Sequence, residues 1–259
     1  MRTIAKNKLL QDCVSKCKEQ GFVKDGANYY RLFGEGLIQV VTLNGFPERT
    51  SLDNYSREPA VCFAVYSAFS DIYWNPCYMK PRRALVPNIF PGLVAPGGNA
   101  KDFLGTALEA VRMRQYVLPF LNELTTHEKM VDLYNTVDSS SDKCSRIIDC
   151  NRIVPYVLAG EIESALDMIS RIETQNWEAF HDNCLTAKRY DAVKQQSRIE
   201  QNLAPLQALR KTILEQDAPG IWDILQRNYH ANISVLQSMG VPHPQDFSSK
   251  IKERLNLII

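Results

Sequence analysis

The sequence predicts an α+β fold, in which an N-terminal helix and an antiparallel sheet of three to five strands pack against a mainly helical C-terminal half. Strand-like runs occur only in the first ninety residues, and helical apolar spacing dominates after residue 100. We divide the chain into residues 1–100, a sheet portion that includes a proline-rich segment at 75–99, and residues 101–259, a helical portion packed on it. The two portions could also form one single domain.

Composition excludes several classes of protein. The 259 residues include 30 basic and 29 acidic side chains, a net charge of +1, so the chain lacks the basic excess typical of a nucleic-acid-binding protein. The longest uncharged apolar run, Ala60 to Phe69, is half of the roughly twenty residues that a membrane span needs. Seven charged residues are spread over the first twenty positions, where a signal peptide would have an apolar stretch. We therefore expect a cytoplasmic protein that does not insert into membranes.

The seven cysteines do not predict a disulfide framework, because their number is odd and their spacing irregular. Cys13 and Cys17 instead belong to an apolar stripe, with Leu10 and Val14, on a helix that ends near residue 20. Gly21 can adopt the left-handed conformation that closes this helix. Buried cysteines of this kind behave as small apolar side chains.

Three strands follow this first helix. Tyr29–Phe33 and Leu37–Leu43 are rich in β-branched and aromatic residues, and glycines at 34 and 36 supply a turn between them. Residues 61–69 form a third strand that is apolar on both faces, which predicts a central position under helices. Residues 44–59 form a polar connection between the second and third strands.

The residues after 70 change character. Prolines at 76, 81, 87, 91 and 96 exclude a long helix or a central strand, while interleaved aromatic and aliphatic residues favour an ordered irregular segment. Apolar spacing then predicts helices over 104–121 with a break at Pro119, 127–137, 152–174 as a hairpin that bends at Gly160, 186–216 with a bend near Pro205, 219–239 and 247–259.

Several of these runs resemble one known family. They are Tyr29-Tyr30-Arg31, residues 37–43, the strand near Phe63, the run Val117-Leu118-Pro119-Phe120-Leu121, and the hairpin over 156–165. Over about residues 5–175 the chain is similar to a bacterial family described only as a domain of unknown function, numbered four thousand three hundred and four. The resemblance implies an α+β fold and no assigned activity.

Two groups of residues are candidates for ligand binding. The first is an anion site, in which basic side chains stand before a turn that opens a helix. Its residues are Lys80, Arg82, Arg83, Gly97, Gly98 and Asn99. The alternative is that Asn99 simply caps the helix, with Asp102 three residues on, and the chain has no phosphate-binding loop of the Gly-x-x-x-x-Gly-Lys type.

The second group lies inside the predicted strands. Arg31 and Gln39 could line a pocket with Tyr29 if all three face the same side of the sheet. The alternative, which we favour, is a solvated sheet face on which polar residues alternate with apolar ones.

No motif predicts catalysis, a metal or a cofactor. His181 and Cys184 have the spacing of two zinc ligands, but no second pair accompanies them. The chain has no Gly-x-Ser-x-Gly motif. Basic residues on the late helices are interspersed with acidic ones, which favours a solvated face over a nucleic-acid-binding stripe. They are Lys188, Arg189, Lys194, Arg198, Arg210 and Lys211.

These observations favour a non-catalytic protein-interaction module that holds another protein through its helical half. A regulatory or toxin-neutralising role would fit, by analogy of fold alone. The alternative is a protein, or an enzyme, that binds an anion or small ligand between the sheet and residues 76–99.

Overall fold

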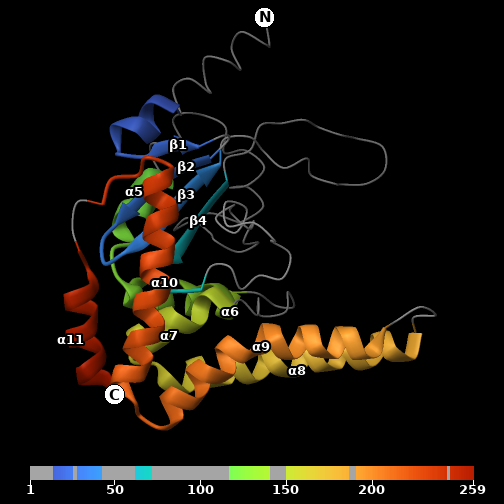
Figure 1. Ribbon diagram of the computed structural model, residues 1–259. Coiled ribbons are helices and arrows are strands. Elements are labelled where there is room, and N and C mark those ends of the chain that lie inside the picture. Colours follow the sequence, from blue (N-terminus) through green and yellow to red (C-terminus); the bar gives the residue numbers. More distant parts are fainter. Residues whose placement is uncertain are drawn as a thin grey trace, which may run out of the picture.

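The computed structural model describes residues 14–25, 28–42, 62–71, 117–140, 150–186, 191–243 and 246–259. Strands lie near the N-terminus and helices make up most of the rest, which confirms the α+β prediction (Figure 1). The first helix is described from residue 14 to 19, and Gly21 follows it with a φ of +79°. The labelled elements are β1 (Val23–Asp25), β2 (Asn28–Phe33), β3 (Leu37–Thr42), β4 (Cys62–Ser67), α5 (Leu118–Glu123), α6 (His127–Ser140), η3 (Cys150–Arg152), α7 (Ile153–Leu158), α8 (Ile162–Thr186), α9 (Ala192–Leu214), α10 (Ala218–Ser238) and α11 (Ser248–Ile258).

The four strands pair antiparallel in the order in which the chain runs. Gly34 and Gly36 both have positive φ values in the turn that joins β2 to β3, as their spacing predicts. Arg31 lies opposite Gln39, and Gln39 lies opposite Val65, so the three side chains share one face of the sheet. β1 was not predicted, because a three-residue strand is too short to show a pattern.

The predicted central position of the third strand is wrong. β4 lies at one end of the β1–β4 order. Val65 and Tyr66 point to opposite faces, yet both are buried. The apolar character of both sides of this strand therefore correctly predicted that both of its faces are covered. It carried no information about which strands pair with it.

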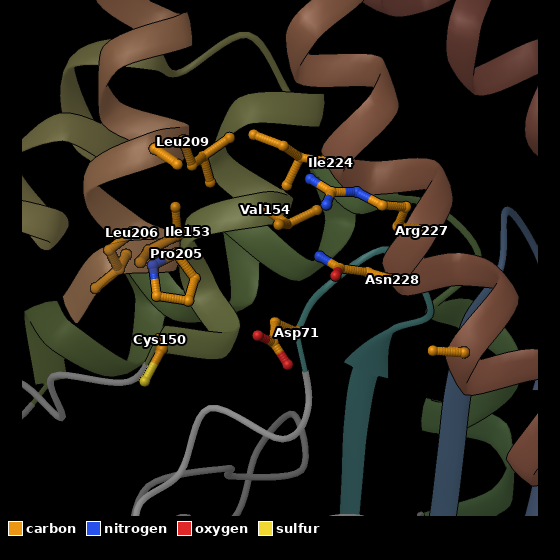
Figure 2. A pocket seen from close by; sticks show the side chains of 12 residues that line it. Asp71, Cys150, Ile153, Val154, Pro205, Leu206, Leu209, Ile224, Arg227 and Asn228 are labelled. Atoms are coloured by element: carbon orange, nitrogen blue, oxygen red, sulfur yellow. The ribbon is translucent and has the colours of Figure 1, made fainter. Parts of the chain in front are cut away.

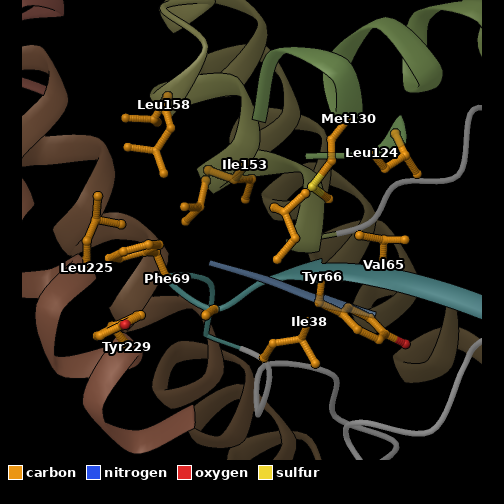
Figure 3. Close-up of a cluster of buried hydrophobic side chains, with 14 of the residues drawn as sticks. Ile38, Val65, Tyr66, Phe69, Leu124, Met130, Ile153, Leu158, Leu225 and Tyr229 are labelled. Carbon is orange, nitrogen blue, oxygen red and sulfur yellow. The ribbon is translucent and has the colours of Figure 1, made fainter. Parts of the chain in front are cut away.

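α10 fixes the chain directly after β4. Asn232 donates from Nδ2 to the carbonyl oxygens of Ala68 and Ser70, both at 2.8 Å. The ring of Phe69 stacks on Tyr229 of α10, with centroids 4.6 Å apart. Figure 3 shows these rings beside Leu225, in a cluster that also contains sheet residues such as Ile38 and Tyr66. One hydrophobic cluster therefore spans the sheet and the helices that pack on it.

The helical half contains a long antiparallel hairpin. α7 turns at Gly160, as predicted, and leads into α8, which continues to Thr186, past the predicted end at residue 174. The predicted start of the next helix at 186 is also wrong, since α9 begins at Ala192 with Asp191 as its cap. α9 continues through Pro205 as a helix. The outer halves of α8 and α9 extend away from the rest of the protein (Figure 1).

We predict that Gly34→Ala destabilises the fold by about 2 kcal/mol more than Gly21→Ala. Both glycines have positive φ, so each alanine pays the left-handed penalty of about 1–2 kcal/mol. Only at position 34 would the new Cβ meet backbone, 2.1 Å from the carbonyl oxygen of Thr125, whereas nothing lies within 4 Å at position 21. Urea unfolding of both variants measures the difference, and equal losses would contradict this packing.

Candidate functional site

Six of the eight predicted site residues lie outside the described residues. They are Lys80, Arg82, Arg83, Gly97, Gly98 and Asn99. The anion site built on them therefore stays a prediction. The other two, Arg31 and Gln39, are both described and lie side by side on β2 and β3.

Arg31 and Gln39 do not form a solvated sheet face, so the favoured interpretation was wrong. Arg31 is only 5% exposed and Gln39 is fully buried. Nε of Arg31 donates to Oε1 of Gln39 at 2.7 Å, and Nε2 of Gln39 donates to the carbonyl oxygens of Leu121 and Leu124. Both side chains are therefore part of the interior, where they join the sheet to α5.

The two terminal nitrogens of Arg31 also donate to protein acceptors. Its Nη1 donates to the carbonyl oxygen of Gln20 at 2.9 Å, and its Nη2 donates to Oδ1 of Asn122 at 2.5 Å. The guanidinium lies 4.5 Å from the ring centroid of Phe22 and 4.1 Å from that of Phe33. Burial lowers the pKa of Arg31 to about 10, so it stays protonated at neutral pH. Each nitrogen of this guanidinium donates to a different part of the protein, so Arg31 holds these elements together.

A second polar cluster has the residue types of a hydrolase triad. Oγ of Ser67 lies 2.9 Å from Nε2 of His127, and Nδ1 of His127 lies 3.9 Å from Oε2 of Glu35. Sequence analysis missed this cluster because its members come from β4, α6 and the β2–β3 turn. A single serine within the apolar run of β4, and a glutamate between two glycines, were the only signals available.

Burial excludes this cluster as a nucleophilic centre. Ser67 and His127 are both fully buried, and Oγ of Ser67 already accepts a hydrogen bond from the backbone N–H of Phe69. A catalytic serine must reach its substrate with its base within hydrogen-bond distance. Here Ser67 meets only protein, so the cluster is structural.

Glu35 is the ionic centre of this cluster. Its Oε1 pairs with Nζ of Lys250 and Nη2 of Arg254, both at 2.7 Å, and Arg254 also pairs with Glu128 at 2.9 Å. Burial alone would raise the pKa of Glu35, but His127, Arg254 and Lys250 together hold that pKa well below its ordinary value. Burial lowers the pKa of His127, against the opposing influence of Glu35. α11 is thus attached to the β2–β3 turn by paired charges.

A pocket of about 510 Å³ opens between α7, α9, α10 and Asp71, which follows the turn after β4. Its walls are mostly aliphatic, and polar groups are confined to one part of it. Figure 2 shows Val154, Leu206, Leu209 and Ile224 around the cavity, and Asp71, Arg227 and Asn228 on one side. No sequence motif could reveal this pocket, because its residues belong to four separate segments.

Similarity to known proteins, metal-binding clusters and membrane spans point to no further candidate site in the described residues. Comparisons with protein-family models, curated proteins and solved structures found no match. In the described ranges, no three histidine, cysteine, aspartate or glutamate side chains gather closely enough to hold a metal ion. No helix in those ranges combines the length and apolar character that crossing a membrane requires. Among the described residues, the pocket and the α8–α9 hairpin are two features on which a function can be proposed.

We predict that Arg31→Met destabilises the fold by about 3 kcal/mol, because one buried and two partly buried acceptors lose their donor. Arg171→Met is the matched control, since Arg171 pairs with Asp167 on the surface of α8 and should cost less than about 1 kcal/mol. Arg31→Lys should not restore stability, because one ammonium cannot reach all three acceptors between two rings. Chemical denaturation measures all three, and similar losses for Arg31→Met and Arg171→Met would contradict the network.

We also predict that stability falls as the pH falls, in two stages. His127 has a lowered pKa in the fold, so the unfolded chain takes up a proton first below the ordinary value of 6.5. The stabilisation by Glu35, whose pKa is also lowered, is present above its ordinary value of 4.5 and is lost as the pH falls below it.

Two variants separate these stages. His127→Gln should flatten the stability profile between about pH 7 and pH 5, whereas Glu35→Gln should keep that slope and lose the fall at lower pH. Urea midpoints across this range provide the measurement. A wild-type profile that is level from about pH 7 to pH 5 would show that His127 titrates alike in the folded and unfolded chain.

Proposed function

We propose that this protein is a non-catalytic protein-interaction module that binds a partner through the outer half of the α8–α9 hairpin. We call this outer half the arm, residues 174–186 and 191–202. The observation that carries the proposal is that the arm projects from the body with its apolar tip open to solvent (Figure 1).

The base of the hairpin is fixed, which gives the arm a defined direction. Met168, Ile169 and Ile172 of α8 are buried, as are Leu203 and Leu206 of α9. Arg210 of α9 pairs with Glu173 of α8 across the hairpin at 2.7 Å. An interaction surface that is already rigid loses little conformational entropy when it binds.

The arm itself exposes nearly all of its side chains. Phe180, which packs edge-on against Trp177 with centroids 5.8 Å apart, is the single buried side chain among the arm residues whose burial is described. The amides of Asn176 and Asn183 donate to carbonyls of α8 itself, at 2.8 and 2.7 Å. The two helices therefore contact each other through a narrow seam and leave their outer faces open.

Two large apolar residues lie at the tip of the arm. Leu185 is 85% exposed near the end of α8, and Val193 is 80% exposed near the start of α9. Isolated exposed apolar residues are ordinary, but these two flank the same connection. Acidic and basic residues are mixed around them, which fits a protein partner better than the phosphate backbone of a nucleic acid.

The proposal also includes the cellular location and the source of the protein. None of the three cysteines with described side chains, Cys17, Cys150 and Cys184, forms a disulfide, which suits the reducing cytoplasm. The resemblance to a bacterial family of unknown function suggests a bacterial source. A regulatory or toxin-neutralising protein is one kind of module that works by holding a partner in this way.

We predict that the double variant Leu185→Glu/Val193→Glu loses at least about tenfold in affinity for the partner, since each apolar contact at an interface centre is worth about 1 kcal/mol or more. Leu257→Glu is the matched control, because Leu257 is an equally exposed leucine on α11. Tagged wild-type protein and both variants are incubated with extract of the source organism, cross-linked and compared by mass spectrometry.

The proposal requires a protein that is recovered by wild type and Leu257→Glu, lost by the tip variant, and cross-linked to arm residues. Thermal melting of all three proteins shows that they fold equally well. Recovery of the same proteins in equal amounts by all three, or cross-links confined to the body, would refute binding by the arm.

A further inference from the structure

The pocket between α7, α9 and α10 is a second functional feature, independent of the arm. Its volume of about 510 Å³ lies within the range of small-molecule sites and far above the size of a packing defect. Among the described residues that line it, most are aliphatic and none is aromatic. Such walls favour a flexible aliphatic body over a flat aromatic ring that would need a stacking partner.

Arg227 is a cationic residue of the pocket, and its guanidinium has donors that remain available to a ligand. Arg227 donates from Nε to the carbonyl oxygen of Asp223 in its own helix, at 3.2 Å. No carboxylate of the described residues forms an ion pair with it. Figure 2 shows its guanidinium turned toward Val154 and Ile224, over the apolar wall. The terminal nitrogens are thus placed to hold the head of a ligand whose body lies against that wall.

The other polar groups of the pocket are already committed. Nδ2 of Asn228 donates to the carbonyl oxygen of Phe69 at 3.2 Å, which fixes the amide at the pocket edge. Asp71 also lines the pocket and has an interaction partner of its own. Arg227 is therefore the group that decides the charge of the ligand head.

We propose that this pocket binds an aliphatic carboxylate of medium chain length, with the chain between α7, α9 and α10 and the carboxylate on the guanidinium of Arg227. The bidentate geometry of guanidinium and carboxylate makes this head more suitable than a neutral alcohol. Each methylene that leaves water adds to the affinity, so chains that fill the cavity bind better than short ones.

Decanoate and decanol are the probes, used below their aggregation limits and measured by isothermal titration calorimetry. Wild-type protein should bind decanoate at least tenfold more tightly than decanol. Arg227→Met keeps the apolar stem but removes the charge, so it should bind decanoate at least tenfold more weakly and decanol unchanged. Ala231→Trp places a large ring at an exposed helix position on the pocket rim and should abolish binding of both.

Two cysteines report where the ligand lies. Cys150 lines the pocket, while Cys184 is exposed on the arm. Decanoate should slow alkylation of Cys150 by N-ethylmaleimide in wild type and leave Cys184 unaffected. Absence of decanoate binding, equal binding by Arg227→Met, or binding that survives Ala231→Trp would each overturn the proposal. None of these results bears on the arm, which lies on a different part of the protein.

Discussion

The buried pair of Arg31 and Gln39 is the interaction on which the rest of the structure depends. A guanidinium inside a protein is tolerated only when its donors are satisfied, and here the acceptors come from the first helix, from β3 and from α5. Gln39 in turn accounts for two carbonyl groups at the end of α5, which a helix terminus leaves without partners. A shift of α5 by one residue would leave several of these groups unpaired, so the pair fixes α5 on the sheet.

Two further anchors then determine where the remaining helices lie. Glu35, in the turn between β2 and β3, holds α11 through Lys250 and Arg254. Asn232 of α10 holds the chain that follows β4. Both anchors lie at the same end of the sheet, because the N–H of Ala68 donates to the carbonyl oxygen of Gly36. The inner half of α9 packs against the other helices, and its outer half extends beyond them as the arm.

Local sequence patterns were sufficient to predict much of the fold, but they were insufficient to predict the candidate functional site. The β2–β3 hairpin could be predicted because two glycines separate two β-branched runs, and α10 and α11 because their apolar spacing is regular. The position at which α8 ends could not be predicted, because residues 175–186 lack a buried apolar stripe and their helix is stabilised by packing against α9. The buried environment of Arg31 could not be predicted either, since its hydrogen-bond partners lie up to 91 residues away along the chain.

A comparison of two arginines shows what decides between a structural and a functional role. Arg31 and Arg227 are the same residue type, and neither has a carboxylate partner among the described residues. Each guanidinium nitrogen of Arg31 donates to protein, and two aromatic rings lie against it, so its role is structural. Arg227 spends one donor on its own helix and presents the others to a cavity. Identifying the partner of each donor therefore separates the two roles. The same criterion gives Ser67 and His127 a structural role, because Oγ of Ser67 and Nε2 of His127 contact each other in the interior.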